Sequence, residues 1–432
     1  MNRFKFFILL IFLTSCSLDT KSGIWTKKQK IIEEEKQNIK SLFETENVLE
    51  NELNTNLVIK LTSRLSSNSF INSQSNNNGR LDYDGNLKST SKFKFSKIKN
   101  FESLEPEILA INNNLIFHNN KGTLIKFDPS SKIIWKKNFY NKQEKKTNPI
   151  IFFNNNKNIL IVADNISKYY AVDIENGNLI WSKENSSPFN SQVKIYKDKF
   201  FIVDFENTLR AYSINDGKEL WNIKTGDTFI KSEKKLSIVI TNNIVYFNNS
   251  IGDISAVDIE SGNLLWQTPT QNSTIYQDSF SLKTSDLITD GKSIVFSNNK
   301  NEFYSIDAKS GFLKWKQKIN SNLTSTMVNQ LIFTISNEGY FVVIDDKTGN
   351  MIRVTDVFSQ FKKRRLKINP VGFFVGKQNI YLTTNHGRLL VIDISSGKTK
   401  KVLKIDNEKI SRPFILNKNL FIIKENSIIK LN

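Results

Sequence analysis

The chain contains the stretch Ala171-Val172-Asp173-Ile174-Glu175-Asn176-Gly177-Asn178-Leu179-Ile180-Trp181, whose skeleton Ala-x-Asp-x3-Gly-x3-Trp recurs along most of its length. Successive copies lie 38 to 49 residues apart, and apolar and polar residues alternate before each Asp position. A repeat of this length built from strand-like residues is typical of a β-propeller, in which each copy forms one blade. The copies supply these skeleton residues: Asp128 and Trp135; Asp173, Gly177 and Trp181; Gly217 and Trp221; Asp258, Gly262 and Trp266; Asp307, Gly311 and Trp315; Asp345 and Gly349; Asp393 and Gly397.

Each part of the skeleton predicts a structural role. An Asp followed by Gly four residues later indicates a tight turn, because the carboxylate bonds nearby backbone N–H groups and Gly adopts the positive φ. The Trp falls on the next strand, where its ring is buried between adjacent blades. Five of the six tryptophans occupy this position, so we interpret them as architecture rather than as platforms for a ligand. The sixth and seventh copies carry Arg353 and Lys401 there.

Between neighbouring copies there is room for two more strands. In the second blade, four strands are predicted at 148–153, 159–163, 168–173 and 179–183, separated by turns rich in Asn and Gly. Four strands per blade is the usual propeller arrangement.

The end of the chain predicts how the ring closes. Residues 427–431 repeat only the strand part of the unit, so the last blade needs an outer strand from elsewhere, and 91–95 has the required alternation. Joining both ends in one blade leaves no open edge. The predicted fold class is therefore all-β: an eight-bladed β-propeller of four-stranded antiparallel blades, spanning 91–432.

The first residues resemble the signal of a bacterial lipoprotein. A basic start is followed by an apolar core too short to span a bilayer, and then by Leu13-Thr14-Ser15-Cys16, which resembles a lipobox. Residues 1–15 are therefore predicted to be a signal peptide and Cys16 to carry the lipid. Cys16 is the only cysteine, which excludes an internal disulfide. The alternative is an ordinary cleaved signal with an incidental cysteine.

The residues after Cys16 predict where the protein is sorted and how it is tethered. Ser17 replaces the Asp that retains many lipoproteins at the inner membrane, which indicates an outer-membrane, lipid-anchored protein facing the periplasm. Residues 16–90 are predicted to be a lipidated tether, partly helical or disordered. Within it, 27–61 is charged with loosely helical apolar spacing, and 66–79 is a run of Ser, Asn and Gln.

The formal net charge of +19 raises the question of a nucleic-acid partner. No such partner is expected, because an exported lipoprotein does not meet the chromosome and the lysines are spread over all blades. One dense cluster, Lys362-Lys363-Arg364-Arg365-Leu366-Lys367, is interpreted as a solvated loop. Its alternative is contact with anionic lipid headgroups or an acidic partner.

Residues with the pattern of a catalytic or metal site are not found. His118 and His386 are the only histidines, and both are predicted to be turn residues because each precedes a Gly. No Gly-rich phosphate loop opens a helix, and nothing nominates a triad or a zinc site. The prediction is a protein with no catalytic residues, no metal and no cofactor.

The repeat resembles that of the pyrroloquinoline-quinone-type propellers. This family includes quinoprotein alcohol dehydrogenases and the non-enzymatic BamB lipoproteins of the outer-membrane β-barrel assembly machinery. The lipobox, the lack of large inserts and the lack of a second cysteine favour the BamB-like branch. That resemblance implies a scaffold that docks on the periplasmic domains of the barrel-inserting subunit (BamA-like) and assists delivery of unfolded outer-membrane proteins.

The resemblance also implies a partner contact in a loop entering the fourth copy. The nearest match is Phe229, Ile230 and Lys231, with Lys in place of the family's Arg, which keeps the charge but loses the bidentate fork. An ordinary loop is the competing interpretation of these residues. The acidic pair expected in the next loop is not evident at 281–283. Two other functions stay open: a periplasmic propeller that binds another envelope component, and a quinone-dependent dehydrogenase with Ca²⁺ in the central funnel.

Overall fold

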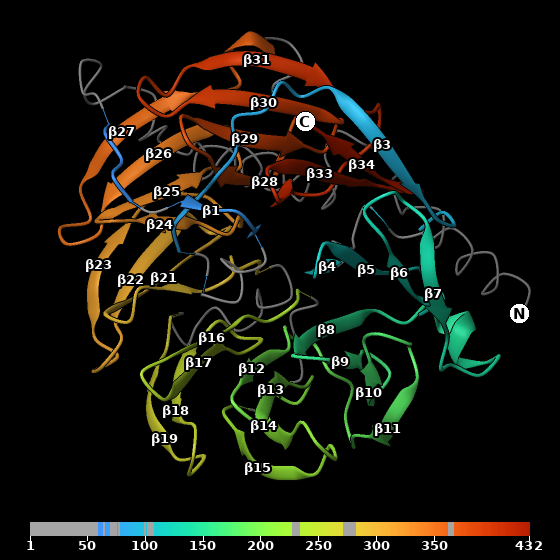
Figure 1. The fold of residues 1–432 in the computed structure, drawn as a ribbon. Helices are drawn as coiled ribbons and strands as arrows, with labels where there is room; N and C mark the ends of the chain where they lie inside the picture. Colours follow the sequence, from blue (N-terminus) through green and yellow to red (C-terminus); the bar gives the residue numbers. More distant parts are fainter. Residues whose placement is uncertain are drawn as a thin grey trace, which may run out of the picture. The chain divides into compact units, whose positions relative to one another are not determined.

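The structure is a computed structural model of the chain. It describes residues 59–63, 65–69, 76, 78–98, 101, 108–226, 234–270, 282–361 and 367–432. In this part of the chain the strands form eight four-stranded sheets and one two-stranded sheet (Figure 1). No helix among these residues is long and apolar enough to cross a membrane. The predicted all-β, eight-bladed propeller is confirmed.

The strands run outward in order through each blade. Blades 1 to 4 are β4 (Ile108–Ile111), β5 (Asn114–His118), β6 (Leu124–Phe127), β7 (Ile133–Lys137); β8 (Ile151–Asn156), β9 (Ile159–Asp164), β10 (Lys168–Asp173), β11 (Leu179–Glu184); β12 (Lys194–Tyr196), β13 (Lys199–Val203), β14 (Thr208–Ser213), β15 (Glu219–Lys224); β16 (Ile238–Thr241), β17 (Ile244–Asn248), β18 (Ile254–Asp258), β19 (Leu264–Thr268). A short 3-10 helix, η1 (Glu144–Thr147), joins blades 1 and 2.

The remaining blades repeat this order, and the last one takes its outer strand from the other end of the chain. Blades 5 to 8 are β20 (Ile288–Thr289), β21 (Ser293–Asn298), β22 (Glu302–Asp307), β23 (Leu313–Gln317); β24 (Thr326–Val328), β25 (Leu331–Ile335), β26 (Tyr340–Asp345), β27 (Met351–Asp356); β28 (Pro370–Val375), β29 (Asn379–Thr384), β30 (Arg388–Asp393), β31 (Thr399–Lys404); β32 (Phe414–Leu416), β33 (Asn419–Lys424), β34 (Ser427–Leu431), β3 (Ser89–Lys94).

The hydrophobic core lies between blades. Middle strands such as β9 and β10 are buried along most of their length, whereas the outer strand β11 is mostly exposed. Leu160 and Tyr170 of blade 2 pack in one cluster with Ile116 and Leu124 of blade 1. Because each sheet buries its apolar side chains against the next sheet, the blades stabilise one another around the ring.

Each Trp of the skeleton joins its own blade to the next one. The Trp315 indole Nε1 donates to the Asp346 carbonyl of the following blade at 2.7 Å, and the same contact starts from Trp135, Trp181, Trp221 and Trp266. The Gly in the turn of the next blade lies against the indole ring. Gly349 has φ +74°, and a Cβ there would lie 2.6 Å from Trp315 Cγ. The turn is therefore selected for Gly by both its conformation and this close approach.

The contact of blade 6 with blade 7 and that of blade 7 with blade 8 have no Trp at the repeat position. Arg353, in the Trp position of blade 6, is buried and donates from Nη1 to the Ser396 carbonyl at 2.7 Å. Its alkyl stem lies under Gly397, as an indole does elsewhere. Lys401, the equivalent residue of blade 7, is exposed. In blade 8 the outer strand is β3, so β34 is not joined to it by the turn on which an indole docks in the other blades.

The ring closes through β3, which pairs antiparallel with β34 in blade 8. Phe93 is buried and contacts Phe127 of blade 1 and Phe421 of its own blade, with ring centroids 5.6 and 6.1 Å apart. The closing strand therefore lies at the predicted place, shifted slightly toward the N-terminus.

Part of the segment assigned to the tether also contacts the propeller. β1 (Leu65–Ser66) pairs in parallel with β2 (Arg80–Leu81), and isolated bridges join Asn68 to Leu416 and Asn78 to Met327. The amide of Asn76 exchanges hydrogen bonds with the backbone of Ile240. An Asn side chain carries both hydrogen-bond donors and an acceptor. This polar stretch, which resembles a linker in composition, can therefore form hydrogen bonds with backbone groups of the inner strands.

Candidate partner-docking surface

The connections between blades 3 and 4 and between blades 4 and 5 are where the family resemblance implies a partner contact. Phe229, Ile230 and Lys231 lie outside the described residues, as does the lipidation candidate Cys16. The end of the first connection is held against blade 3, because Leu236 N–H donates to the Asn190 carbonyl at 2.8 Å and the Asn190 amide donates to the Lys234 carbonyl at 3.2 Å.

A group of charged residues lies beside these connections, near the start of the inner strands. Asp286 precedes β20 by two residues, and Arg412 occupies the equivalent place before β32. Thr324, before β24, donates from its hydroxyl to Asp286 Oδ2 at 2.9 Å. Since inner strands surround the centre of a propeller, side chains from different blades meet here.

The electrostatics of this group are dominated by positive charge. Burial alone would raise the pKa of Asp286, but the charges of Lys235, Lys234 and Arg412, with the Thr324 hydrogen bond, outweigh it and place the pKa below its ordinary value. Lys234 also donates to the Asn322 carbonyl at 3.3 Å. Asp286 is thus a carboxylate surrounded by three cationic side chains.

Sequence reasoning missed this charged group, although a local signal exists. Ser285 immediately precedes Asp286, and its hydroxyl accepts a hydrogen bond from Ser297 N–H at 2.9 Å. Ser411 directly precedes Arg412, and its hydroxyl likewise accepts a hydrogen bond from the N–H of Ile423. A Ser three residues before an inner strand therefore marks the residue after it as the one that faces the centre.

The two histidines and the basic cluster 362–367 can also be compared with the structure. His386 lies exposed in a turn, but His118 does not: it is the last residue of β5, buried and stacked beside Phe117. The turn prediction was wrong for His118 because the turn Gly comes four residues later and leaves room for the strand to continue. Of the basic cluster 362–367, the structure describes Lys367, which is exposed.

The acidic pair sought near 281–283 has no counterpart among the residues seen there. Leu282 is buried and Lys283 is exposed, so the carboxylate that faces this surface is that of Asp286. Across the described ranges, no group of three or more His, Cys, Asp or Glu residues could hold a metal ion.

A sequence model of the family described as outer membrane protein assembly factor BamB matches residues 113–355, more than half of the chain. The chain belongs to the BamB family. Outer membrane protein assembly factor BamB of Legionella pneumophila (strain Paris) is 22% identical over 223 residues, covering 49% of this chain and 52% of that protein. The chain thus spans about half the length of this curated relative.

Solved structures agree with the BamB family fold. BamB from Moraxella catarrhalis matches with a TM-score of 0.63 at 14% identity, covering 80% of this chain and 99% of that one. A quinohemoprotein alcohol dehydrogenase from Comamonas testosteroni also matches, with a TM-score of 0.63 at 10% identity, covering 85% and 82%. Identities this low establish the fold alone, so they do not separate an assembly factor from a dehydrogenase.

Asp286→Asn tests the charged centre of this BamB-family propeller. We expect it to lower the free energy of unfolding at pH 7 by about 1 kcal/mol, the scale of a charge-assisted contact on a partly exposed group. Because the folded pKa lies below the ordinary 3.8, this stability is present above pH 3.8 and is lost as the pH falls through the folded value.

Urea unfolding of wild type and variant at pH 7 and at about pH 2 checks this linkage. The difference between them is expected at pH 7 and should vanish at the acid end. A difference of equal size at both pH values would contradict the charge argument. Glu184→Gln, an exposed carboxylate on β11, is the matched control and should change little.

Proposed function

We propose that this protein is a non-enzymatic scaffold subunit of the outer-membrane β-barrel assembly machinery. Its membership of the BamB family carries the proposal. The lipobox-like sequence at Cys16 and the serine that follows support anchoring by a lipid at the periplasmic face of the outer membrane. In this proposal residues 1–15 are a signal peptide removed before anchoring.

The propeller would act by binding partner proteins, without making or breaking a covalent bond. Its first six blades are joined in sequence by indole contacts, so the connections at the ends of their strands are displayed on a rigid support. We propose that the connection holding Phe229, Ile230 and Lys231, with the adjacent charged group around Asp286, docks on the periplasmic domains of a BamA-like subunit. Unfolded outer-membrane proteins would pair as added strands with exposed outer-strand edges.

Photo-crosslinking in intact cells tests this assignment. A photoreactive residue at position 231 is expected to capture the barrel-inserting subunit, while one at position 309 is not. Lys309 is a matched control because it is exposed in the turn before β23, at the opposite end of the strands. Equal capture at both positions, or capture of unrelated envelope proteins only, would overturn the docking assignment.

A further inference from the structure

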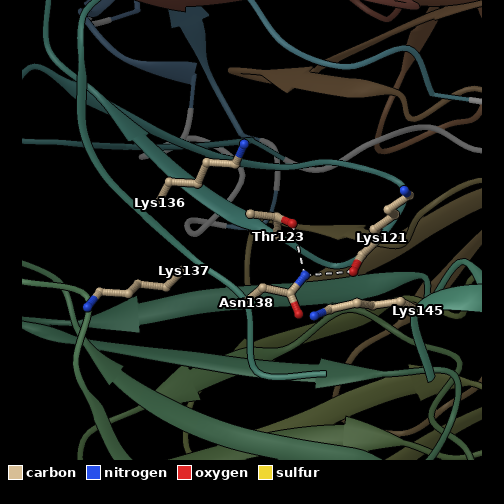
Figure 2. A pocket seen from close by; sticks show the side chains of 6 residues that line it. All are labelled: Lys121, Thr123, Lys136, Lys137, Asn138 and Lys145. Carbon is tan, nitrogen blue, oxygen red and sulfur yellow. Dashed lines mark hydrogen bonds between the residues drawn. The ribbon is translucent and has the colours of Figure 1, made fainter. Parts of the chain in front are cut away.

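The outer rim of blade 1 carries an open cavity of about 360 Å³. The residues lining it are Lys121, Thr123, Lys136, Lys137, Asn138 and Lys145 (Figure 2). Three elements supply the lysines: the turn after β5, strand β7 and helix η1. The Asn138 amide donates to the Lys121 carbonyl and the Thr123 hydroxyl, both at 2.9 Å, and so holds the turn against the end of β7.

Among the residues that the structure describes, the four ammonium groups have no ion-pair partner. Within the described chain, none of Lys121, Lys136, Lys137 and Lys145 forms an ion pair, and the sequence neighbour Glu144 interacts with Lys168 at 3.5 Å instead. Four lysines lining one open cavity make this part of the surface attractive to anions, and lysine binds phosphate as a flexible point charge.

Exposed aliphatic side chains adjoin the lysines. Ile133 and Ile134, directly before the basic residues of β7, are 52% and 47% exposed, and Leu179 and Ile180 of β11 are each 46% exposed. In both strands the second of the pair is a bulge residue without a cross-strand partner, which turns it outward.

The two blades meet at the stem of Lys137. Its Cγ lies so near the turn of blade 2 that a Cβ on Gly177 would be 2.9 Å away. This turn leads directly into Leu179 and Ile180, so the basic cavity and both aliphatic pairs lie on the surface along the contact between blades 1 and 2. We call this surface the blade 1–2 rim.

We propose that the blade 1–2 rim is a contact surface for a bilayer containing anionic phospholipid. The lysines receive the headgroup phosphates, and the aliphatic pairs enter the apolar part of the interface. A nucleic acid would satisfy the lysines but offers no apolar phase for four aliphatic side chains. Blade 7 lacks the combination, since Thr399 and Lys400 occupy the places of Leu179 and Ile180. This inference goes beyond the proposed function, which does not require the propeller itself to touch lipid.

Vesicle co-sedimentation tests the rim on residues 16–432 carrying Cys16→Ser, so that neither the predicted signal peptide nor a lipid anchor contributes. We expect binding to phosphatidylcholine vesicles with about one-fifth phosphatidylglycerol and little binding to pure phosphatidylcholine. The combined variant K121Q, K136Q, K137Q, K145Q should weaken binding by about 600-fold, given roughly five-fold per lysine at an anionic surface. The matched control K292Q, K309Q, K347Q, K398Q removes four exposed lysines from turns elsewhere and should change it less than about three-fold.

A second variant separates bilayer contact from simple anion binding. Ile133→Ser with Ile134→Ser should weaken vesicle binding several-fold while leaving retention on a phosphate-bearing resin unchanged; no effect on vesicles would show that only phosphate is recognised and would overturn the proposal. Equal losses in the two lysine variants would also overturn it, by showing dependence on net charge alone. All substituted side chains reach solvent, and a thermal unfolding curve confirms the fold of each variant.

Discussion

Trp315→Ala is expected to lower the free energy of unfolding by about 3–5 kcal/mol, the range for removing a large aromatic side chain from a packed core. Trp315 is 8% exposed, stacks on Phe303 with centroids 6.0 Å apart and supports the turn at Gly349. Its loss also leaves the Asp346 carbonyl of the next blade without its 2.7 Å donor. Urea unfolding followed by circular dichroism measures the change.

Lys401→Ala is the matched control, because Lys401 has the same register in blade 7 as Trp315 has in blade 5. The lysine is exposed, and we expect a change within about 0.5 kcal/mol. A loss at Trp315 no larger than the one at Lys401 would show that the indoles do not join the blades. Trp315→Phe should fall between the two, since it keeps much of the apolar contact and loses the hydrogen bond.

Phe93→Ala is expected to lower the free energy of unfolding by about 3–5 kcal/mol and to open the ring at its closing blade. Phe93 is the one side chain of β3 that is buried, and it contacts both Phe127 and Phe421. Without it, β3 is held to β34 mainly by backbone hydrogen bonds. An edge strand that detaches exposes its backbone to proteases, so limited proteolysis should cut the variant first near β3.

Lys92→Ala is the control on the same strand, because Lys92 is exposed beside Phe93 and keeps the pairing with Ile429. It should leave both stability and the first cleavage site unchanged. If proteases cut Phe93→Ala first inside another blade, β3 would not be the element that closes the ring.

Much of the fold could be predicted because its determinants are local. Alternation of apolar and polar residues specifies a strand, and Asp with Gly four residues later specifies a turn, as in 168–181. The repetition of this unit gives the blade number, and the truncated last copy predicts that the closing strand comes from the other terminus. Asp173 illustrates the turn chemistry: its carboxylate accepts hydrogen bonds from Glu175 and Asn176 N–H at 2.9 and 3.0 Å.

The side chains that make contacts between neighbouring blades, and those that meet at the centre of the propeller, could not be predicted in the same way. Arg353 breaks the Trp pattern, yet it fills the same slot because its stem packs under Gly397 and its guanidinium reaches a carbonyl of the next blade. The pairing of Asn78 with Met327 joins residues far apart in the chain, within a stretch that resembles linker by composition.

The sequence alone therefore determined the architecture, the number of blades and the way the ring closes, because these follow from short-range backbone preferences repeated along the chain. Tertiary structure alone decided which side chains meet. Asp286 faces Thr324 and Arg412 from other blades, and the Lys137 stem meets the turn of blade 2, because ring closure brings distant residues together. Such contacts depend on the geometry between blades, which no single copy of the repeat encodes.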